Sequence, residues 1–271
     1  MTLRAHHLVA AGGGAAPHPW RDVAKYLLVL AALVWLLARG TGDLGYNWHW
    51  YRVPPYLWRV EAGRLVAGPL LSGLWVTLKI SAISLVLAFL IGLTVALLRL
   101  SPSFLGRRLA WGYLELIRNT PLLVQLFFIY FVVAPVLGIE AFASAVLALS
   151  LFEGAYASEI IRAGIVSIPH GQWEAARSLG LHPRHIYRRV ILPQALRWTL
   201  PPLTGQAISL IKDSALVSTI AIYDLTMQGR AIISETYLVF EIWFTVAAVY
   251  LLLTFTLSLA VRSLESRLRT V

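Results

Sequence analysis

Long apolar runs separated by short polar breaks make up most of the chain between residues 23 and 261. A helix needs about 20 mostly apolar residues to cross a hydrocarbon core of about 30 Å. By this measure the pattern predicts six spans, at 23–38, 73–98, 109–134, 141–161, 203–222 and 240–261. Strands of a membrane barrel would be shorter and would alternate in polarity, so the runs favour helices. We therefore predict an all-α membrane protein with about six transmembrane helices.

Turn-forming residues stand between the runs and indicate where the spans end. They are Gly40 to Gly42 after the first run, Ser101 to Ser103 after the second, Pro135 after the third, and Pro201 with Pro202 before the fifth. Glycine and proline are the strongest local breaks of regular structure. The sequence therefore predicts that the fifth span begins after Pro202.

Composition supports the membrane assignment. Hydrophobic residues make up 58% of the chain and charged residues only 13%, whereas a soluble domain has about 25% charged residues. This composition argues against an ordinary soluble enzyme. The chain has no cysteine, which excludes disulfides, thiolate metal sites and a thiol nucleophile.

The basic residues predict the orientation. Lys and Arg number 23 against 13 Asp and Glu, a formal net charge of +10. Most of them lie in the flanks and loops on the side that six spans would assign to both termini, and cytoplasmic loops carry such an excess. We expect both termini and the long loop at about 165–200 to be cytoplasmic. The charge is then explained by topology, and nucleic acid is not an expected partner.

The N-terminal part divides into a cytoplasmic tail at 1–22, a first transmembrane helix at 23–39 and an external loop at 40–69. The first span is short enough to be the apolar region of a signal peptide, but its basic flank would be unusually long, so an uncleaved anchor is favoured. The aromatic-rich stretch 46–58 reads as an amphipathic segment resting at the membrane interface, in preference to an aromatic ligand cage.

The loop at 171–183 has the pattern of two short helices around a turn. Glu174 to Leu179 favour helix, Gly180 suits the left-handed position after a helix, and Pro183 suits the first turn of the next helix. Glu174-Ala175-Ala176, Gly180 and the later Leu192-Pro193 resemble the Glu-Ala-Ala loop of ABC importer permeases. Val190 stands where that loop usually has Ile.

Three further segments narrow the resemblance. Residues 116–125, 153–165 and 208–216 are similar to polar amino-acid permeases of the histidine, glutamine and glutamate type. Glu153 departs from that pattern, which often has a neutral polar residue there. The resemblance covers about 70–268 and implies a five-helix type I ABC importer permease domain at 70–268, preceded by the extra helix.

The resemblance implies a division of labour between subunits. This chain would be the permease subunit of an ATP-driven importer in a bacterial cytoplasmic (inner) membrane, and not an enzyme. Its partners would be an ABC ATPase dimer, a second permease subunit of the same or a homologous kind, an extracytoplasmic amino-acid-binding protein, a polar amino acid and the lipid bilayer. The residues expected to couple to the ATPase are Glu174, Ala175, Ala176, Gly180, Leu181 and Pro193. Glu174 is expected in the first turn of its helix, where the helix dipole favours a carboxylate.

Ionisable residues inside spans are costly and therefore mark sites or structural pairs. Glu115 with Arg118 and Glu159 with Arg162 are three residues apart on a helix and are predicted to pair. Pro121 should kink the third span and free the carbonyl of Ile117. A zwitterionic amino acid needs partners of both signs, and the candidates for the substrate path are Arg118, Asn119, Thr120, Gln125, Glu153, Ser209, Lys212 and Asp213.

Other chemistry is not indicated. The chain has no phosphate-binding Gly-x-x-x-x-Gly-Lys-Ser/Thr loop, so ATP and Mg are expected on the partner ATPase and no cofactor in this chain. His182 and His185 lack further ligands, and no metal site is expected. Two alternatives stay open from the residues alone. One is an ion-gradient-driven secondary transporter that uses Lys212, Asp213 and the carboxylates, and the other is a membrane scaffold or sensor.

Overall fold

The computed structural model describes residues 19–43 and 46–269. The chain divides into two compact units, Met1–Trp48 and His49–Val271. Within its described residues, the first unit contains helix α1 (Pro19–Asp43). Its apolar part, Val23–Leu36, is shorter than the about 20 residues that a perpendicular span requires.

The second unit begins with short elements. They are a 3-10 helix η1 (Trp50–Arg52), helix α2 (Pro54–Leu57), and the antiparallel strands β1 (Trp58–Glu61) and β2 (Arg64–Ala67), in which Trp58 pairs with Ala67. The predicted amphipathic segment 46–58 is thus broken into a turn and a short helix before the hairpin. The backbone N–H of His49 donates to Glu241 at 2.7 Å, which ties this segment to the start of the last helix.

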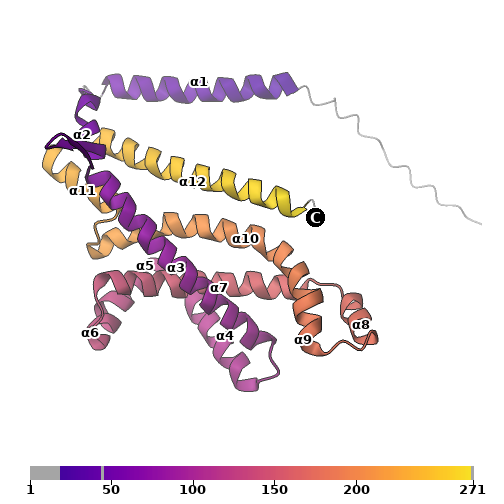
Figure 1. The fold of residues 1–271 in the computed structure, drawn as a ribbon. Helices are drawn as coiled ribbons and strands as arrows, with labels where there is room; N and C mark the ends of the chain where they lie inside the picture. Colours follow the sequence, from indigo (N-terminus) through magenta and orange to yellow (C-terminus); the bar gives the residue numbers. More distant parts are fainter. Residues whose placement is uncertain (1–18, 44–45, 270–271) are drawn as a thin grey trace, which may run out of the picture. The chain divides into compact units, whose positions relative to one another are not determined.

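The remaining elements are helical (Figure 1). They are α3 (Pro69–Leu100), α4 (Phe104–Arg118), α5 (Leu122–Phe128), the π-helix η2 (Ile129–Val133), α6 (Ala134–Leu137), α7 (Ala141–Val166), α8 (His170–Ser178), α9 (Pro183–His185), the π-helix η3 (Ile186–Ile191), α10 (Leu192–Asp213), the 3-10 helix η4 (Ser214–Ile220), α11 (Leu225–Thr236) and α12 (Val239–Arg269).

Three of these helices are long and apolar enough to cross a membrane. They are α3, α7 and the part of α12 at Val239–Ser263. Helix α4 and the segment Leu122–Leu137 form a fourth candidate if they count as one span, but they are bent by 106°. The protein is therefore a mostly helical membrane protein with three or four candidate spans among its described residues.

Helices α3 and α7 form the central pair, and small residues allow their close approach. A Cβ atom added at Gly92 of α3 would lie 2.7 Å from the Cβ of Ala157 on α7. Ser84 and Ser150 are fully buried between the two helices, and Ser150 donates to a backbone carbonyl on each of them. Small residues are typical of helix interfaces within membranes, where packing rather than hydrophobic burial drives association.

The predicted break at Pro201 and Pro202 is wrong. Both prolines lie inside α10, which begins at Leu192 and packs on α7 and α12. Each proline removes one backbone donor. The helix nevertheless continues because buried residues hold it on both sides of the prolines, with Ala195 and Thr199 before them and Leu210 after them. The predicted fifth span at 203–222 therefore begins in the middle of a longer helix, continues through η4 and ends two residues after it.

The helix α11 begins at a buried carboxylate. Asp224 is fully buried and accepts a hydrogen bond from the backbone N–H of Met227 at 2.8 Å, which caps the helix. The hydroxyl of Tyr250 on α12 also donates to it, at 3.4 Å. Burial raises the pKa of Asp224 to about 6, although these hydrogen bonds oppose the shift.

Candidate functional site

The loop between α7 and α10 contains the predicted turn. Helix α8 ends at Ser178, and Gly180 follows with φ +70°, the left-handed conformation that glycine adopts without strain. The N–H of Gly180 donates to the carbonyl of Arg177 at 2.9 Å, and the N–H of Leu181 donates to that of Ala176 at 3.3 Å. This pair of bonds is a Schellman motif, and it reverses the chain. Pro183 then begins α9, as predicted.

The two alanines of the loop have different environments. Ala176 is buried in an apolar cluster with Ile186, Ile191 and Ala195, whereas Ala175 is exposed. Leu181 packs partly against the same cluster, and Pro193 is exposed at the start of α10. Ala176 therefore anchors α8 to the helices that follow, and Ala175 lies on the exposed face of α8.

The predicted location of Glu174 in the first helical turn is wrong. Helix α8 starts at His170, four residues earlier, directly after Pro169 at its N-cap. Glu174 therefore lies in the second turn and gains little from the helix dipole, whose effect is confined to the end turn. Its carboxylate is exposed and lies 3.8 Å from the imidazole of His170.

A hollow of about 400 Å³ opens beside this loop. It is lined by Trp173, Arg177, Gly180, Leu181, Pro183 and Tyr187 among others. Trp173 and Tyr187 meet edge to face, with ring centroids 5.1 Å apart. Sequence reasoning missed these two aromatics, since α8 and η3 are apart in sequence and only the turn brings them together.

The loop is connected to the interior at both ends. Figure 1 shows α8 and α9 at one end of α7 and α10. Helix α7 leads into α8 through Ser167 to Pro169, and η3 continues directly into α10. A force applied to α8 would therefore act on α7 and α10 together.

The predicted kink at Pro121 is present, and the chain bends there by 106° between α4 and the segment Leu122–Leu137. Because Pro121 has no N–H, the carbonyl of Ile117 lacks a helical partner, and the side chain of Gln125 donates to it at 2.7 Å. The same amide also donates to the Thr120 hydroxyl, at 2.8 Å. Asn119 donates to the carboxylate and the carbonyl of Glu115. These polar side chains are thus engaged in stabilising the turn between α4 and α5.

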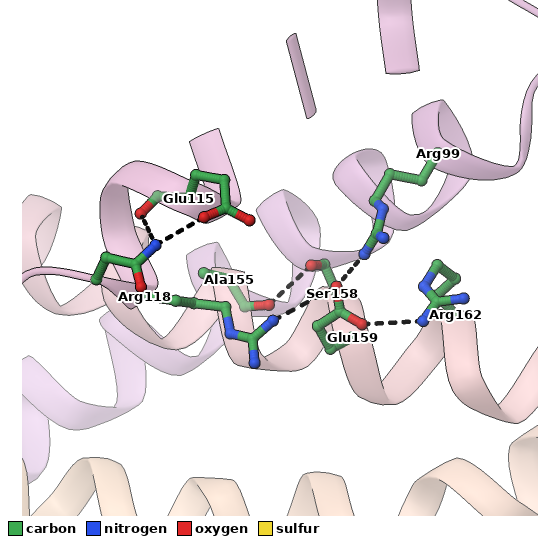
Figure 2. Close-up of polar contacts among 8 residues, drawn as sticks. Arg99, Glu115, Arg118, Ala155, Ser158, Glu159 and Arg162 are labelled. Atoms are coloured by element: carbon green, nitrogen blue, oxygen red, sulfur yellow. Dashed lines mark hydrogen bonds and ion pairs between the residues drawn. The ribbon is translucent and has the colours of Figure 1, made fainter. Parts of the chain in front are cut away.

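Glu159 is the centre of an ion cluster (Figure 2). It pairs with Arg162 at 3.1 Å, as predicted, with Arg99 of α3, and with Arg118 of α4 at 3.8 Å. The predicted pair of Glu115 with Arg118 is wrong, because Arg118 extends across to α7 and Glu115 accepts from Asn119 instead. Three helices therefore meet at one carboxylate.

Glu153 forms a second polar centre. It is fully buried on α7, and its Oε2 accepts from Gln206 of α10 at 2.5 Å. Its Oε1 has no hydrogen-bond partner in the part of the chain that the structure describes. Asp213, at the end of α10, faces the same carboxyl. Ser209 is half-buried on α10, while Lys212 is exposed.

Glu153 borders a cavity of about 360 Å³ between α3, α7 and α10. The other lining residues include Phe89 from α3, Ala157 from α7, and Leu203, Thr204 and Gln206 from α10. Gln206 was missed from the sequence, although its seven-residue spacing from Asp213 places both on one helix face. Within the described residues, no group of three His, Asp or Glu side chains could hold a metal ion.

Comparisons with known proteins agree with this architecture. A family model described as "Binding-protein-dependent transport system inner membrane component" matches residues 88–270. The glutamine transport system permease protein GlnP of Escherichia coli is 40% identical over 203 residues, which cover 74% of this chain and 93% of that protein. The L-cystine transport system permease protein TcyB of Bacillus subtilis is 41% identical over 206 residues, covering 74% and 87%. The nopaline transport system permease protein NocM of Agrobacterium fabrum is 40% identical over 200 residues, covering 70% and 83%.

Solved structures show the same relationship. A chain from the crystal structure of an amino acid ABC transporter with histidines is 42% identical and superimposes with a TM-score of 0.69, covering 73% of this chain and 94% of that one. A chain of the methionine ABC transporter MetNI, at 22% identity and a TM-score of 0.65, shares the fold. The chain therefore belongs to the family of inner-membrane components of binding-protein-dependent transport systems, as a multi-pass permease and not a catalytic subunit.

Proposed function

We propose that this chain is the permease subunit of an ATP-driven ABC importer that moves a polar amino acid into the cytoplasm. The relatives named above carry glutamine, L-cystine and nopaline by their descriptions, which supports an amino acid or a derivative as substrate. The observation that carries the proposal is the loop α8–α9. It has an exposed Glu174-Ala175 face, a buried Ala176 anchor and a Gly180 reversal, and it connects the two helices that bear the buried Glu153 centre.

The proposed assembly has three kinds of partner. An ABC ATPase dimer binds ATP and Mg and docks on the α8–α9 loop, a second permease subunit completes the pathway, and an external binding protein delivers the amino acid. We assign six spans, at 23–39 and within 70–268, with both termini and the loop at about 165–200 in the cytoplasm and residues 40–69 outside. The excess of basic residues on the assigned cytoplasmic side supports this orientation.

The geometry suggests how the loop acts. Ala176 packs on Ile186 and Ile191, so α8 cannot move without displacing η3 and α10. Gly164 on α7 lies against Thr199 of α10, so the two helices are also joined beyond the loop. Closure of the ATPase would therefore move α7 and α10 together, and α3 would follow because it packs closely on α7. A conformational change of this kind requires that the ATPase bind one state more tightly than the other.

The Glu153 centre is the proposed contact for the substrate. Glu153 borders the cavity, and its Oε1, which has no hydrogen-bond partner among the described residues, can accept a hydrogen bond from an ammonium group, while Thr204 and Gln206 provide neutral polar partners. Asp213 faces Glu153 and is proposed as part of the same contact. The residues that remain proposed as lining elsewhere along the path are Arg118, Asn119, Thr120, Ser209 and Lys212. Gln125 is proposed only as a support of the bend, since its amide group donates to the backbone.

Co-purification tests the coupling loop. The permease is expressed with a candidate ATPase from the same gene cluster and isolated in detergent, as native chain and as Glu174→Arg. Glu174 is exposed, so reversal of its charge should leave the fold intact and reduce the retained ATPase at least severalfold. Glu235→Arg is the matched control, because Glu235 is an exposed acid on α11, outside the loop.

Transport measurements complete the test. Vesicles with the whole complex should take up the amino acid only with ATP and the binding protein, and Glu153→Gln should reduce uptake while the ATPase stays bound. Full ATPase retention in Glu174→Arg would contradict docking at the loop. Uptake driven by an ion gradient without any ATPase would contradict the importer itself.

A further inference from the structure

A basic hollow lies where α3 and α4 meet, beside the Glu159 ion cluster, with which it shares Arg99. Its volume is about 450 Å³, and it is lined by Arg99, Phe104, Arg107, Arg108 and Trp111. Three guanidinium groups and two aromatic rings thus surround one space, and no carboxylate is among the lining residues.

The amphipathic pattern of α4 explains why these side chains point outward. Gly106, Ala110 and Leu114 are buried and form the inner face of the helix. Phe104, Arg108 and Trp111 follow one another at spacings of four and three residues, which places them together on the outer face. The guanidinium of Arg108 lies 5.2 Å from the centre of the Phe104 ring, a cation–π contact.

The positive charge of the hollow is not compensated within the described chain. Arg107 and Arg108 form no ion pair with any carboxylate that the structure describes, and only Arg99 does, with Glu159. Arginine presents a planar fork of donors that matches two oxygens of a phosphate group. The hollow therefore fits a phosphate-bearing anion.

The surroundings indicate where that phosphate comes from. Leu105 and Leu109 of α4 are 66% and 63% exposed, and Phe104 and Trp111 are 67% and 56% exposed. Arg99 lies in the last turn of the candidate span α3, where a membrane ends. An apolar surface directly beside a phosphate site at the end of a span suits acyl chains joined to a headgroup.

We propose that the hollow between α3 and α4 binds the headgroup of an anionic phospholipid, with Arg107 and Arg108 on the phosphate and the acyl chains along Leu105, Leu109 and Trp111. A zwitterionic headgroup fits less well, because no lining carboxylate can pair with its cation. Arg99 borders the hollow and also pairs with Glu159 (Figure 2), so a bound headgroup competes for Arg99 and connects the lipid to the ion cluster of α7.

Lipid binding to the purified complex tests the site. Native mass spectrometry follows titration with phosphatidylglycerol, and separately with phosphatidylcholine of the same chains. The native complex should prefer the anionic lipid about tenfold, and Arg107→Gln/Arg108→Gln should lose that preference. Arg107→Lys/Arg108→Lys keeps the positive charge that orients the membrane helices but removes the planar guanidinium groups. This variant should bind the anionic lipid about threefold to tenfold more weakly than the native complex does.

The control is Arg188→Gln/Arg189→Gln, an exposed adjacent pair on η3 that lies outside the hollow, and its lipid binding should stay within about twofold of the native value.

Unchanged lipid preference in Arg107→Gln/Arg108→Gln would overturn the proposal, as would equal binding of the two lipids. If inorganic phosphate or glycerophosphoglycerol binds as tightly as the lipid, the site takes a free anion instead. Loss of the ATPase with unchanged lipid binding would identify a protein contact.

Discussion

Gly164 provides a direct test of the joint between α7 and α10. A Cβ atom added there would lie 2.1 Å from the Cγ2 of Thr199, whereas ordinary contacts begin at 3.4 Å, so the methyl group would have to retreat by about 1.3 Å. Thr199 is 4% exposed and lies in a helix, where its branched side chain has few rotamers. We expect Gly164→Ala to destabilise the protein by about 2–3 kcal/mol, in the upper part of the range for overpacked cores.

Thermal unfolding in detergent measures this effect. A loss of about 2–3 kcal/mol should lower Tm by about 4–10 °C for a chain of this size. Thr199→Ser removes the clashing methyl and keeps the hydroxyl, and alone should cost about 1 kcal/mol. In the Thr199→Ser background, Gly164→Ala should become nearly neutral, because the next atom, the Ala195 carbonyl oxygen, is 3.4 Å away.

The matched control is Gly205→Ala, a helical glycine of α10 with no atom within 4 Å of its added Cβ. It should be neutral or slightly stabilising, since alanine favours helix more than glycine does. If Gly164→Ala melts at the native temperature, or if Thr199→Ser does not relieve its effect, the two helices are not in contact as described. The coupling mechanism would then lose the joint that moves α7 and α10 together.

Three further substitutions test particular contacts, each by its melting temperature in detergent. Because the pKa of Asp224 is raised to about 6 in the folded state, the stability that Asp224 contributes should be complete below pH 4 and fall by about 3 kcal/mol as pH rises past 6. Asp224→Asn keeps the helix cap and should abolish that dependence, and an unchanged pH profile would contradict it. Glu159→Gln removes the charge that Arg162 and Arg99 share, and since these side chains are a quarter or more exposed, the loss should be about 1–3 kcal/mol. Gln125→Leu leaves the Ile117 carbonyl without its donor and should cost about 1–3 kcal/mol, and a native Tm would show that another group satisfies that carbonyl.

The sequence was a reliable guide where a feature depends on neighbouring residues. The left-handed Gly180, the start of α9 at Pro183, and the freed Ile117 carbonyl before Pro121 all follow from backbone geometry within one or two turns. Glu159 and Arg162 pair for the same reason, since they lie three apart on one helix. The motif around Glu174 also identified the family, because its residue types are set by the shape of that short loop.

Predictions failed where a distant helix provided the partner. The i,i+3 rule allowed Glu115 to pair with Arg118, but α7 offers Arg118 the carboxylate of Glu159. Pro201 and Pro202 looked like a boundary, but packing of the flanking residues on α7 outweighs the two lost hydrogen bonds. Helix α8 begins four residues before Glu174, so a first-turn position inferred from the motif was wrong.

The sequence by itself determined the membrane character, the family and the turn at Gly180, because hydropathy and backbone preferences act over short distances along the chain. Only the tertiary structure decided which charges meet, that Glu153 faces Gln206 and a cavity, and that Arg99 lies between a carboxylate and a basic hollow. The physical reason is that a charge or amide inside a membrane takes the nearest available partner. Which partner is nearest depends on how the helices cross. Arg99 and Glu159 are 60 residues apart, and the local sequence around each of them does not indicate that crossing.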